Sequence, residues 1–355
     1  MFMRGLPRSA ESTWRKGSVR LAISGLGRRI VSTLIAATLA AAAAAAAGAV
    51  PARAAEITFG ITSGTALSLP HYIAEEKQYY GAENLAVTTY VVGSAAGVLQ
   101  QLAGGSLNMA QAATDQTLRA ILRGAPIRIV AGAAANAPFR VVAARNLKSF
   151  GDLKGRTVSV GGLTDVTLYF LRVMARKNGL ADRDYDLLYG GGSPARLAQL
   201  LSGAVAATVL TNPQDFTALE RGYVDLGSVA QYLPHWAQNN VLVDTRWAAA
   251  HRAAVTAFLR AYVRATRYFY DPTNRDDVIA ILAKRTKATP EIAAATYALY
   301  VRDGVIAKDA ALSEAGIRAN LEAFVAMGER ADVPAVAGFL DRSFLAEAVQ
   351  TGSER

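Results

Sequence analysis

The feature that most constrains the fold is a regular alternation of strand-like and helix-like segments. The first cycle reads EITFGIT (56–62), LPHYIAEEKQYY (69–80) and LAVTTYVV (85–92). The first and third segments have strand patterns, and the second is an amphipathic helix pattern opened by a proline. Because a helix separates the strands, neighbouring strands can pair in parallel through crossover connections. The pattern predicts an α/β fold with mainly parallel sheets and helices on both faces.

The alternation restarts after residue 155, which predicts a second lobe. RTVSVGG (156–162) opens the second series with a strand pattern, and the chain returns to the first series near 233–243. A chain of about 300 residues usually divides into two units. We therefore expect two lobes, the first of them discontinuous: residues 55–140 plus 235–350, and residues 141–234.

Residues 1–54 have the pattern of an export signal rather than of a folded element. Seven arginine and lysine residues precede the uncharged run IVSTLIAATLAAAAAAAA (30–47), and the small-x-small sequence Ala52-Arg53-Ala54 follows. This order predicts a signal peptide cleaved near Ala54 and an exported protein. A run of this length can also span a membrane, which leaves a retained anchor on a sensor ectodomain as an alternative. The Arg28-Arg29 pair leaves both the general and the twin-arginine export routes open.

Charge and composition exclude several classes of function. Of the 38 basic and 28 acidic residues, eight and one lie in residues 1–54, which leaves a net charge of +3 for the remainder. So small a charge gives no electrostatic basis for binding nucleic acid. The sequence contains no cysteine, so disulfides, thiolate catalysis and zinc–sulfur sites are excluded. It also lacks the spacings typical of metal ligands and of a nucleophile elbow, so we expect no metal, no cofactor and no catalysis.

Three junctions between a strand and the following helix share glycine with serine or threonine. They are ITSGT (61–65), VGSAAG (92–97) and VGGLTDVT (160–167). In open α/β sheets such junctions gather at the carboxyl edge, where ligands bind. A helix N-terminus offers free N–H groups to an anion there. We therefore expect a ligand cleft at these junctions, whereas YGGGSP (189–194) is interpreted only as a turn into a helix capped by Ser193.

Six longer motifs follow one another along nearly the whole chain after the leader. They are LPHYIAEEKQYYGAENLAVTTY (69–90), GSAAGVLQQLAGGSLNMA (93–110), IRIVAGAA (127–134), FGDLKGRTVSVGG (150–162), GGSPARLAQLLSGAVAATVLTNP (191–213) and LDRSFLAEA (340–348). In this order they resemble the ABC-transporter periplasmic substrate-binding proteins of the sulfonate/nitrate/taurine family, to which thiamine-pyrimidine-synthase-like proteins are related. The chain departs from the family pattern at Asn84, Asn108 and Ala206. Without cysteine, the activity of the synthase is not carried over.

The resemblance implies a two-lobed type II periplasmic binding fold with the ligand cleft between the lobes. Such a protein captures a small polar or anionic solute, here a sulfonate, nitrate, a taurine-like molecule or a heterocycle, when its lobes close. It then delivers the solute to the permease and ATPase subunits of an ABC importer. We expect a monomer that is not an enzyme. An enzyme acting on a small solute in the same cleft is kept as an alternative.

The expected ligand contacts come from both lobes. They are Ser63, Gly64, Thr65, His71, Ser94, Asp115, Arg140, Gly162, Thr164, Asp165, Thr211 and Asn212. Arg140 could pair with a carboxylate or sulfonate. If Asp115 and Asp165 both face the cleft, they would repel a simple anion, and a zwitterion or neutral heterocycle fits better. His71 lies in the first turn of its helix, and we expect it either to line the cleft or to be exposed.

Overall fold

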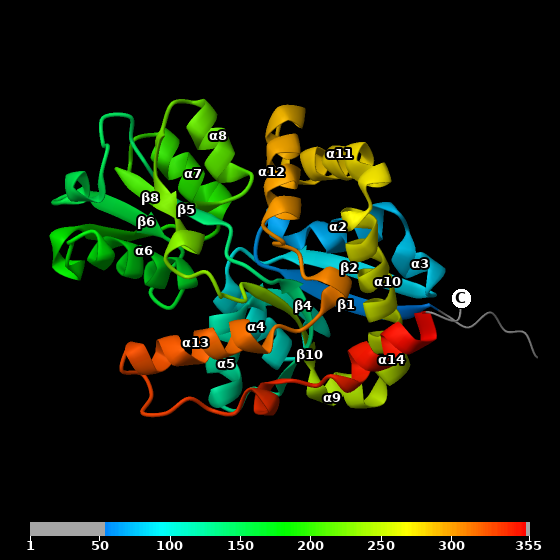
Figure 1. Cartoon of the computed structure of the whole chain (residues 1–355). Helices are drawn as coiled ribbons and strands as arrows, with labels where there is room; N and C mark the ends of the chain where they lie inside the picture. The colour runs from blue at the N-terminus through cyan, green and yellow to red at the C-terminus, as the bar shows by residue number, and fades with distance from the viewer. Residues whose placement is uncertain (1–53, 353–355) are drawn as a thin grey trace, which may run out of the picture. The chain divides into compact units, whose positions relative to one another are not determined.

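The computed structural model describes residues 54–352, and the expected leader with its cleavage site lies outside them. Within this part of the chain, ten strands form two five-stranded sheets (Figure 1). Sheet A has the strand order β2-β1-β3-β10-β4 and is built from β1 (Ala55–Ile61), β2 (Leu85–Val91), β3 (Met109–Ala113), β4 (Ile127–Ala134) and β10 (Asn239–Asp244). Sheet B has the order β7-β6-β8-β5-β9 and is built from β5 (Phe139–Ala143), β6 (Thr157–Val160), β7 (Asp186–Tyr189), β8 (Ala207–Thr211) and β9 (Val224–Ser228).

In each sheet one strand runs against the other four, at the same place in the order. β10 is antiparallel to both β3 and β4, and β5 is antiparallel to both β8 and β9. These are the two strands that directly follow a crossing from one sheet to the other. Such a strand begins at the edge of the sheet where its neighbours end, so it runs antiparallel to them. The predicted α/β, two-lobed fold with mainly parallel sheets is confirmed.

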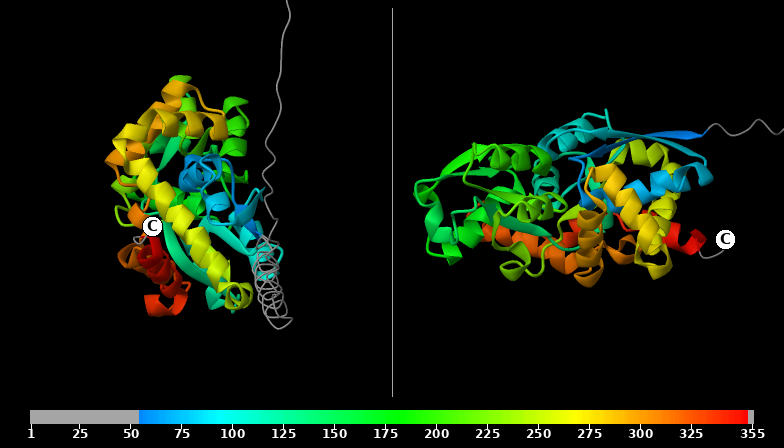
Figure 2. Two further views of the ribbon diagram at one scale, coloured as in Figure 1. Left: turned by 90° about the vertical axis from the view of Figure 1, so that its right-hand side faces the viewer. Right: turned by 90° about the horizontal axis from the view of Figure 1, so that it is seen from above.

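Helices cover both sheets and carry the rest of the chain. Sheet B packs against α6 (Val166–Lys177), α7 (Ser193–Leu201) and α8 (Gln214–Glu220). The other helices, several of them drawn yellow to red in Figures 1 and 2, lie with sheet A. They are α2 (Leu69–Glu76), α3 (Tyr79–Ala82), α4 (Ala95–Ala103), α5 (Thr114–Leu122), α9 (Thr245–Ala250), α10 (Arg252–Tyr270), α11 (Arg275–Thr286), α12 (Pro290–Arg302), α13 (Glu314–Ala326) and α14 (Ser343–Gly352). The helices of the described part are all too short or too polar to span a membrane.

The crossings between the sheets fall in residues 135–138 and 229–238, and we propose them as the lobe boundaries. We call sheet A with its helices lobe 1, and sheet B with α6, α7 and α8 lobe 2. The expected boundary after residue 140 cuts through β5, because this strand already begins at Phe139. The reason is that the chain needs only four residues to pass from one sheet to the other.

The segment after Pro70 differs from the single helix that its pattern predicts. The helix is broken at Gln78, which has a φ of 55°, and it continues as the short α3. Gly81 lies inside α3 and therefore does not end the helix. The left-handed residue that leads into β2 is Asn84, with a φ of 55°, as expected for an asparagine in place of glycine.

Candidate functional site

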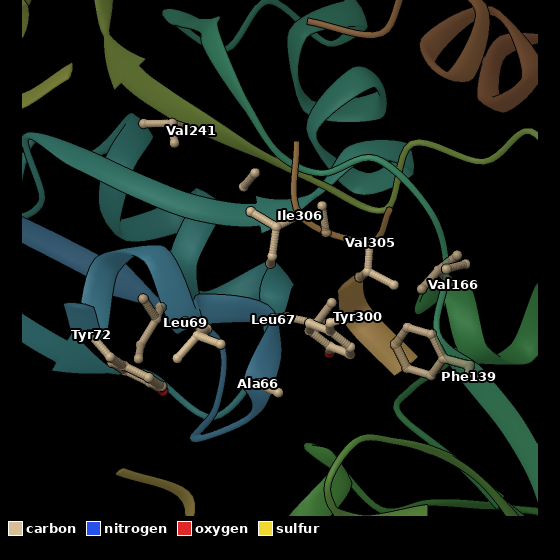
Figure 3. Packing of buried hydrophobic residues seen from close by; sticks show 14 of the residues in the cluster. Ala66, Leu67, Leu69, Tyr72, Phe139, Val166, Val241, Tyr300, Val305 and Ile306 are labelled. Atoms are coloured by element: carbon tan, nitrogen blue, oxygen red, sulfur yellow. The ribbon is translucent and has the colours of Figure 1, made fainter. Parts of the chain in front are cut away.

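A cavity of about 70 Å³ lies where the carboxyl edges of the two sheets face each other. Its wall is formed by the loops after β1, β2, β6 and β7, together with the ends of β3 and β8 and the first residues of β5 and β10. The volume is several times the roughly 10–15 Å³ that one water molecule needs. Its apolar side includes Leu67, Phe139 and Val166, which belong to one buried cluster with Tyr300 (Figure 3). The cavity therefore has room for a small solute.

The two lobes touch each other around this cavity. The Ala66 N–H donates to the Asn212 carbonyl at 3.2 Å, and the Gln116 amide donates to Asp165 at 3.4 Å. Gly192 approaches so closely that a Cβ added to it would lie 3.0 Å from the Cβ of Ser63. These contacts join residues of lobe 1 to residues of lobe 2, so the arrangement is a closed one.

Three helices begin at the wall of the cavity. Ser94 caps α4 by accepting a hydrogen bond from the Gly97 N–H at 3.1 Å. Asp165 caps α6 by accepting one from the Thr167 N–H at 3.0 Å. The third helix, α7, begins at Ser193 itself. Each of these N-termini adds a partial positive charge, which favours a negatively charged group in the cavity.

Arg196 is a buried cation in the cavity wall and is only 3% exposed. Its guanidinium donates to the carbonyls of Gly191 and Val209 and, at 3.3 Å, to the Ser193 hydroxyl. None of these partners within the described residues is a carboxylate. Burial lowers the pKa of Arg196 to about 10, so the group is still charged at neutral pH. The Asp165 carboxylate raises the pKa of Arg196 through space but forms no ion pair with it among the described residues, so an anionic ligand can supply the direct partner that a buried charge normally has.

Five of the twelve residues predicted to contact ligand line the cavity. They are Ser63, Thr65, Ser94, Asp165 and Thr211. The other seven do not line it: Gly64, His71, Asp115, Arg140, Gly162, Thr164 and Asn212. Gly64 and Gly162 lie in the same loops as lining residues. Asn212 lies next to the cavity, where its side chain donates to Asp215 at 2.8 Å and its carbonyl accepts from Ala66.

His71 lies away from the cavity and is fully buried, so both of its expected positions are wrong. Its ring lies 4.4 Å from the ring of Phe59, between centroids. Nδ1 is 2.8 Å from the Tyr80 hydroxyl, and Nε2 is 2.8 Å from the Thr89 hydroxyl. Burial lowers the pKa of His71, which keeps the ring neutral. The helix α2 turns this residue towards α10 instead of the cleft.

The charged residues expected in the cleft are paired elsewhere. Arg140 lies 3.2 Å from a carboxylate oxygen of Asp215 and also pairs with Asp225. Asp115 pairs with Arg119 at 2.6 Å and faces a separate hollow, which Thr164 and Asp165 also line. Arg140 points away from the cavity because side chains alternate along β5, and Phe139 is the residue that faces it.

Residues that the sequence interpretation missed include Ser193, Arg196, Gln111 and Gln238, all in the cavity wall. Ser193 lies in the YGGGSP junction, and Arg196 follows it. Ser193 is not the cap of α7 but its first residue, and its hydroxyl accepts from the Thr211 N–H at 3.0 Å. Arg196 is three residues further on and therefore on the same helix face. A fourth glycine–serine junction was a usable signal for this part of the site.

The described residues contain no group of three or more histidine, cysteine, aspartate or glutamate side chains placed to hold a metal ion. The cavity wall in this part of the chain also includes no histidine beside its serine and threonine hydroxyls. The described wall therefore offers hydrogen-bonding groups, the Arg196 cation and the Asp165 carboxylate.

Comparison with known proteins identifies the family. The model of the family described as NMT1/THI5 like matches residues 66–274. Curated proteins give no match. Similar solved structures include the alkanesulfonate-binding protein SsuA from Xanthomonas axonopodis pv. citri bound to MOPS (20% identity, 82% of this chain and 100% of that chain, TM-score 0.64).

Two further similar structures come from other bacteria. The periplasmic nitrate-binding protein NrtA from Synechocystis PCC 6803 is 16% identical, with 83% of this chain and 88% of that chain covered and a TM-score of 0.66. The zinc-bound ligand-binding component of an ABC-type import system from Staphylococcus aureus is 12% identical, with 83% and 99% covered and a TM-score of 0.71. At these identities the structures establish the shared fold. Since the family model covers more than half of the sequence, the chain belongs to the NMT1/THI5-like family.

Proposed function

We propose that this protein is the extracytoplasmic solute-binding component of an ABC importer and that it captures a small anion between its lobes. The observation that carries the proposal is Arg196, a buried guanidinium without a carboxylate partner in the described chain, at a cavity to which both lobes contribute. Three helix N-termini at the same wall add to the positive potential. An anion would give the guanidinium a direct, charge-assisted hydrogen bond, which none of its partners in the described chain provides.

The similar structures support this proposal by what their names state. They include proteins that bind alkanesulfonates and nitrate, and a component of an import system. The site also favours binding without chemical conversion, because His71 is too deeply packed to act as a base on a solute in the cavity. We therefore assign the protein no catalytic step.

Lobe closure explains how binding would be signalled. The contacts of Gln116 with Asp165 and of Ala66 with Asn212 exist only while the lobes are together. A solute that touches both lobes binds the closed form more tightly and shifts the population towards it. The permease and ATPase subunits of the importer would recognise that form. Residues 1–54, if cleaved as a signal peptide, would release a monomer into the periplasm.

Thermal denaturation with a panel of anions tests the proposal. The panel contains nitrate, short sulfonates and short carboxylates, and the proteins are the wild type, Arg196→Gln and the control Arg183→Gln, whose side chain is exposed. A ligand at 100 times its Kd stabilises the folded state by about 2.7 kcal/mol, so at least one anion should raise the Tm by several degrees.

Arg196→Gln should weaken binding of that anion at least about 30-fold, because a buried charge-assisted contact is lost. The Arg183→Gln protein should respond like the wild type. The proposal is wrong if none of the anions raises the Tm, or if Arg196→Gln binds the anion as tightly as the wild type does.

A further inference from the structure

The side chain of Gln111 in β3 is only 1% exposed and lies in the wall of the cavity. Its amide nitrogen donates to the Leu67 carbonyl at 2.8 Å. Since a carbonyl can only accept, this bond fixes which end of the amide is the nitrogen. The amide oxygen, Oε1, then has no hydrogen-bond partner among the described residues. It is a buried acceptor of fixed orientation beside a ligand cavity.

A second buried acceptor lines the same cavity. Gln238 is 2% exposed, also lines the cavity, and has an unpartnered Oε1 within the described chain. It directly precedes β10, and its backbone carbonyl accepts from the Thr114 N–H at the end of β3. The two glutamines thus come from adjacent strands of sheet A. Together they give lobe 1 a wall that accepts hydrogen bonds.

The opposite wall has the reverse character. Arg196 belongs to lobe 2 and brings a positive charge with only donor groups to the cavity. The carboxylate of Asp165 also lines the cavity and contributes the only negative side chain among the described lining residues. A ligand that carries only a negative charge would satisfy Arg196 but would leave both glutamine oxygens without a donor.

We infer that Gln111 is a specificity-determining residue that accepts an N–H from the solute. The preferred solute is then a small anion that also carries an ammonium group. Its anionic end lies at Arg196, and its N–H groups reach Gln111, Gln238 and Asp165. This inference rests on the proposed function. A site built around a buried hydrogen bond rejects analogues that lack the donor far more strongly than a site that only loses apolar contact.

Two matched pairs of probes test the inference. β-Alanine is compared with propionate, and 2-aminoethanesulfonate with ethanesulfonate, because the members of each pair differ only by the ammonium group. Isothermal titration of the wild type should give a Kd at least 10-fold lower for the amino member of at least one pair. In Gln111→Met, which keeps the length of the side chain, this preference should fall at least 10-fold. The plain anion should bind this variant within about 3-fold of the wild type.

Gln238→Met serves as the second variant, because Gln111→Met could disturb the loop that holds Leu67. In Gln238→Met the preference for the amino member of a pair should also be smaller than in the wild type. The inference is overturned if the plain and the amino member of each pair bind the wild type equally well. It is also overturned if each variant weakens the binding of the plain member as much as that of the amino member. If no member of either pair binds at all and nitrate also fails, the proposed function itself is wrong. Binding of the plain anions alone contradicts only the role of Gln111.

Discussion

His71 and Gln111 are both almost completely buried in lobe 1, but the structure satisfies their hydrogen-bonding groups very differently. Nδ1 of His71 has Tyr80 as its partner, and Nε2 has Thr89, with the Glu75 carboxylate 3.2 Å from the same nitrogen. The Thr89 hydroxyl donates to Glu75 at 2.5 Å, so its oxygen accepts from His71 Nε2–H, and Nδ1 accepts from Tyr80. This one arrangement satisfies a neutral ring completely.

The polar groups around the cavity follow the opposite rule. The oxygens of Gln111 and Gln238 have no partner in the described part of the chain, and Arg196 forms no ion pair there. Leaving one buried acceptor unpaired costs about 1–3 kcal/mol. Full pairing thus marks a structural network, whereas incomplete pairing at a cavity marks a place where a ligand supplies the missing partners.

Replacing His71 should have the largest effect on stability and little effect on binding. His71→Ala removes a ring packed against Phe59 and leaves Tyr80 and Thr89 without their partner. We expect the free energy of unfolding to fall by about 3 kcal/mol, measured by urea denaturation. The control His235→Ala replaces an exposed histidine and should change it by less than about 0.5 kcal/mol. If His71→Ala lost more free energy of solute binding than free energy of unfolding, the separation of the His71 network from the cavity would be contradicted.

The same histidine should make stability depend on pH. Burial lowers the pKa of His71 below the ordinary value of 6.5, so below that pH the unfolded chain binds a proton that the folded chain does not. Its contribution to stability is complete above pH 6.5 and is lost as the pH falls towards the lowered pKa, with a slope of at most about 1.4 kcal/mol per pH unit.

Urea denaturation of the wild type and of His71→Ala between pH 7.5 and 5 checks this pH dependence. The wild type should lose more stability over the range than His71→Ala. Glu75, which lies 3.2 Å from His71 Nε2, has a pKa lowered to about 2 and stays ionised in the folded wild type over this range. Burial raises the pKa of Asp115 and of Asp215 to about 6, which has the opposite sign, so only the difference between the two proteins is diagnostic. Parallel curves would show that His71 is not held neutral.

The smallest effect is expected where the lobes meet. In Gly192→Ala the new Cβ would lie 3.0 Å from Ser63 across the cleft, so the closed form must open slightly. We expect solute affinity to fall about 3- to 10-fold with an unchanged Tm of the free protein. Gly162→Ala is the matched control, since its Cβ would meet nothing closer than 4.0 Å. Equal affinities for the two variants would contradict the closed arrangement as the binding form.

The sequence predicts the regular elements well because their signals are local. Alternating patterns located most strands, and glycine–hydroxyl junctions placed Ser63, Ser94 and Asp165 at the cavity. Strands β5 and β10 run antiparallel for a non-local reason, the crossing between sheets, which no local pattern records. The position of His71 depends on packing against Phe258 of α10, almost 190 residues away in the chain.

The residues with the most specific chemistry were the hardest to predict. Gln111 lies in the strand MAQAA, whose small side chains indicate burial but not an unpaired amide oxygen. Arg196 lies in a helix pattern in which an arginine is normally exposed. Only the contacts of the folded chain show that the Gln111 amide oxygen has no donor and that the Arg196 guanidinium has no carboxylate as a hydrogen-bond partner.

A crystal structure of the protein with the tightest-binding anion of the panel tests the central claim most directly. We expect the anion inside the cavity, with one of its oxygens within hydrogen-bond distance of the Arg196 guanidinium and with residues of both lobes around it. An anion bound outside the cavity would contradict the account, as would an Arg196 that makes no contact with the bound anion.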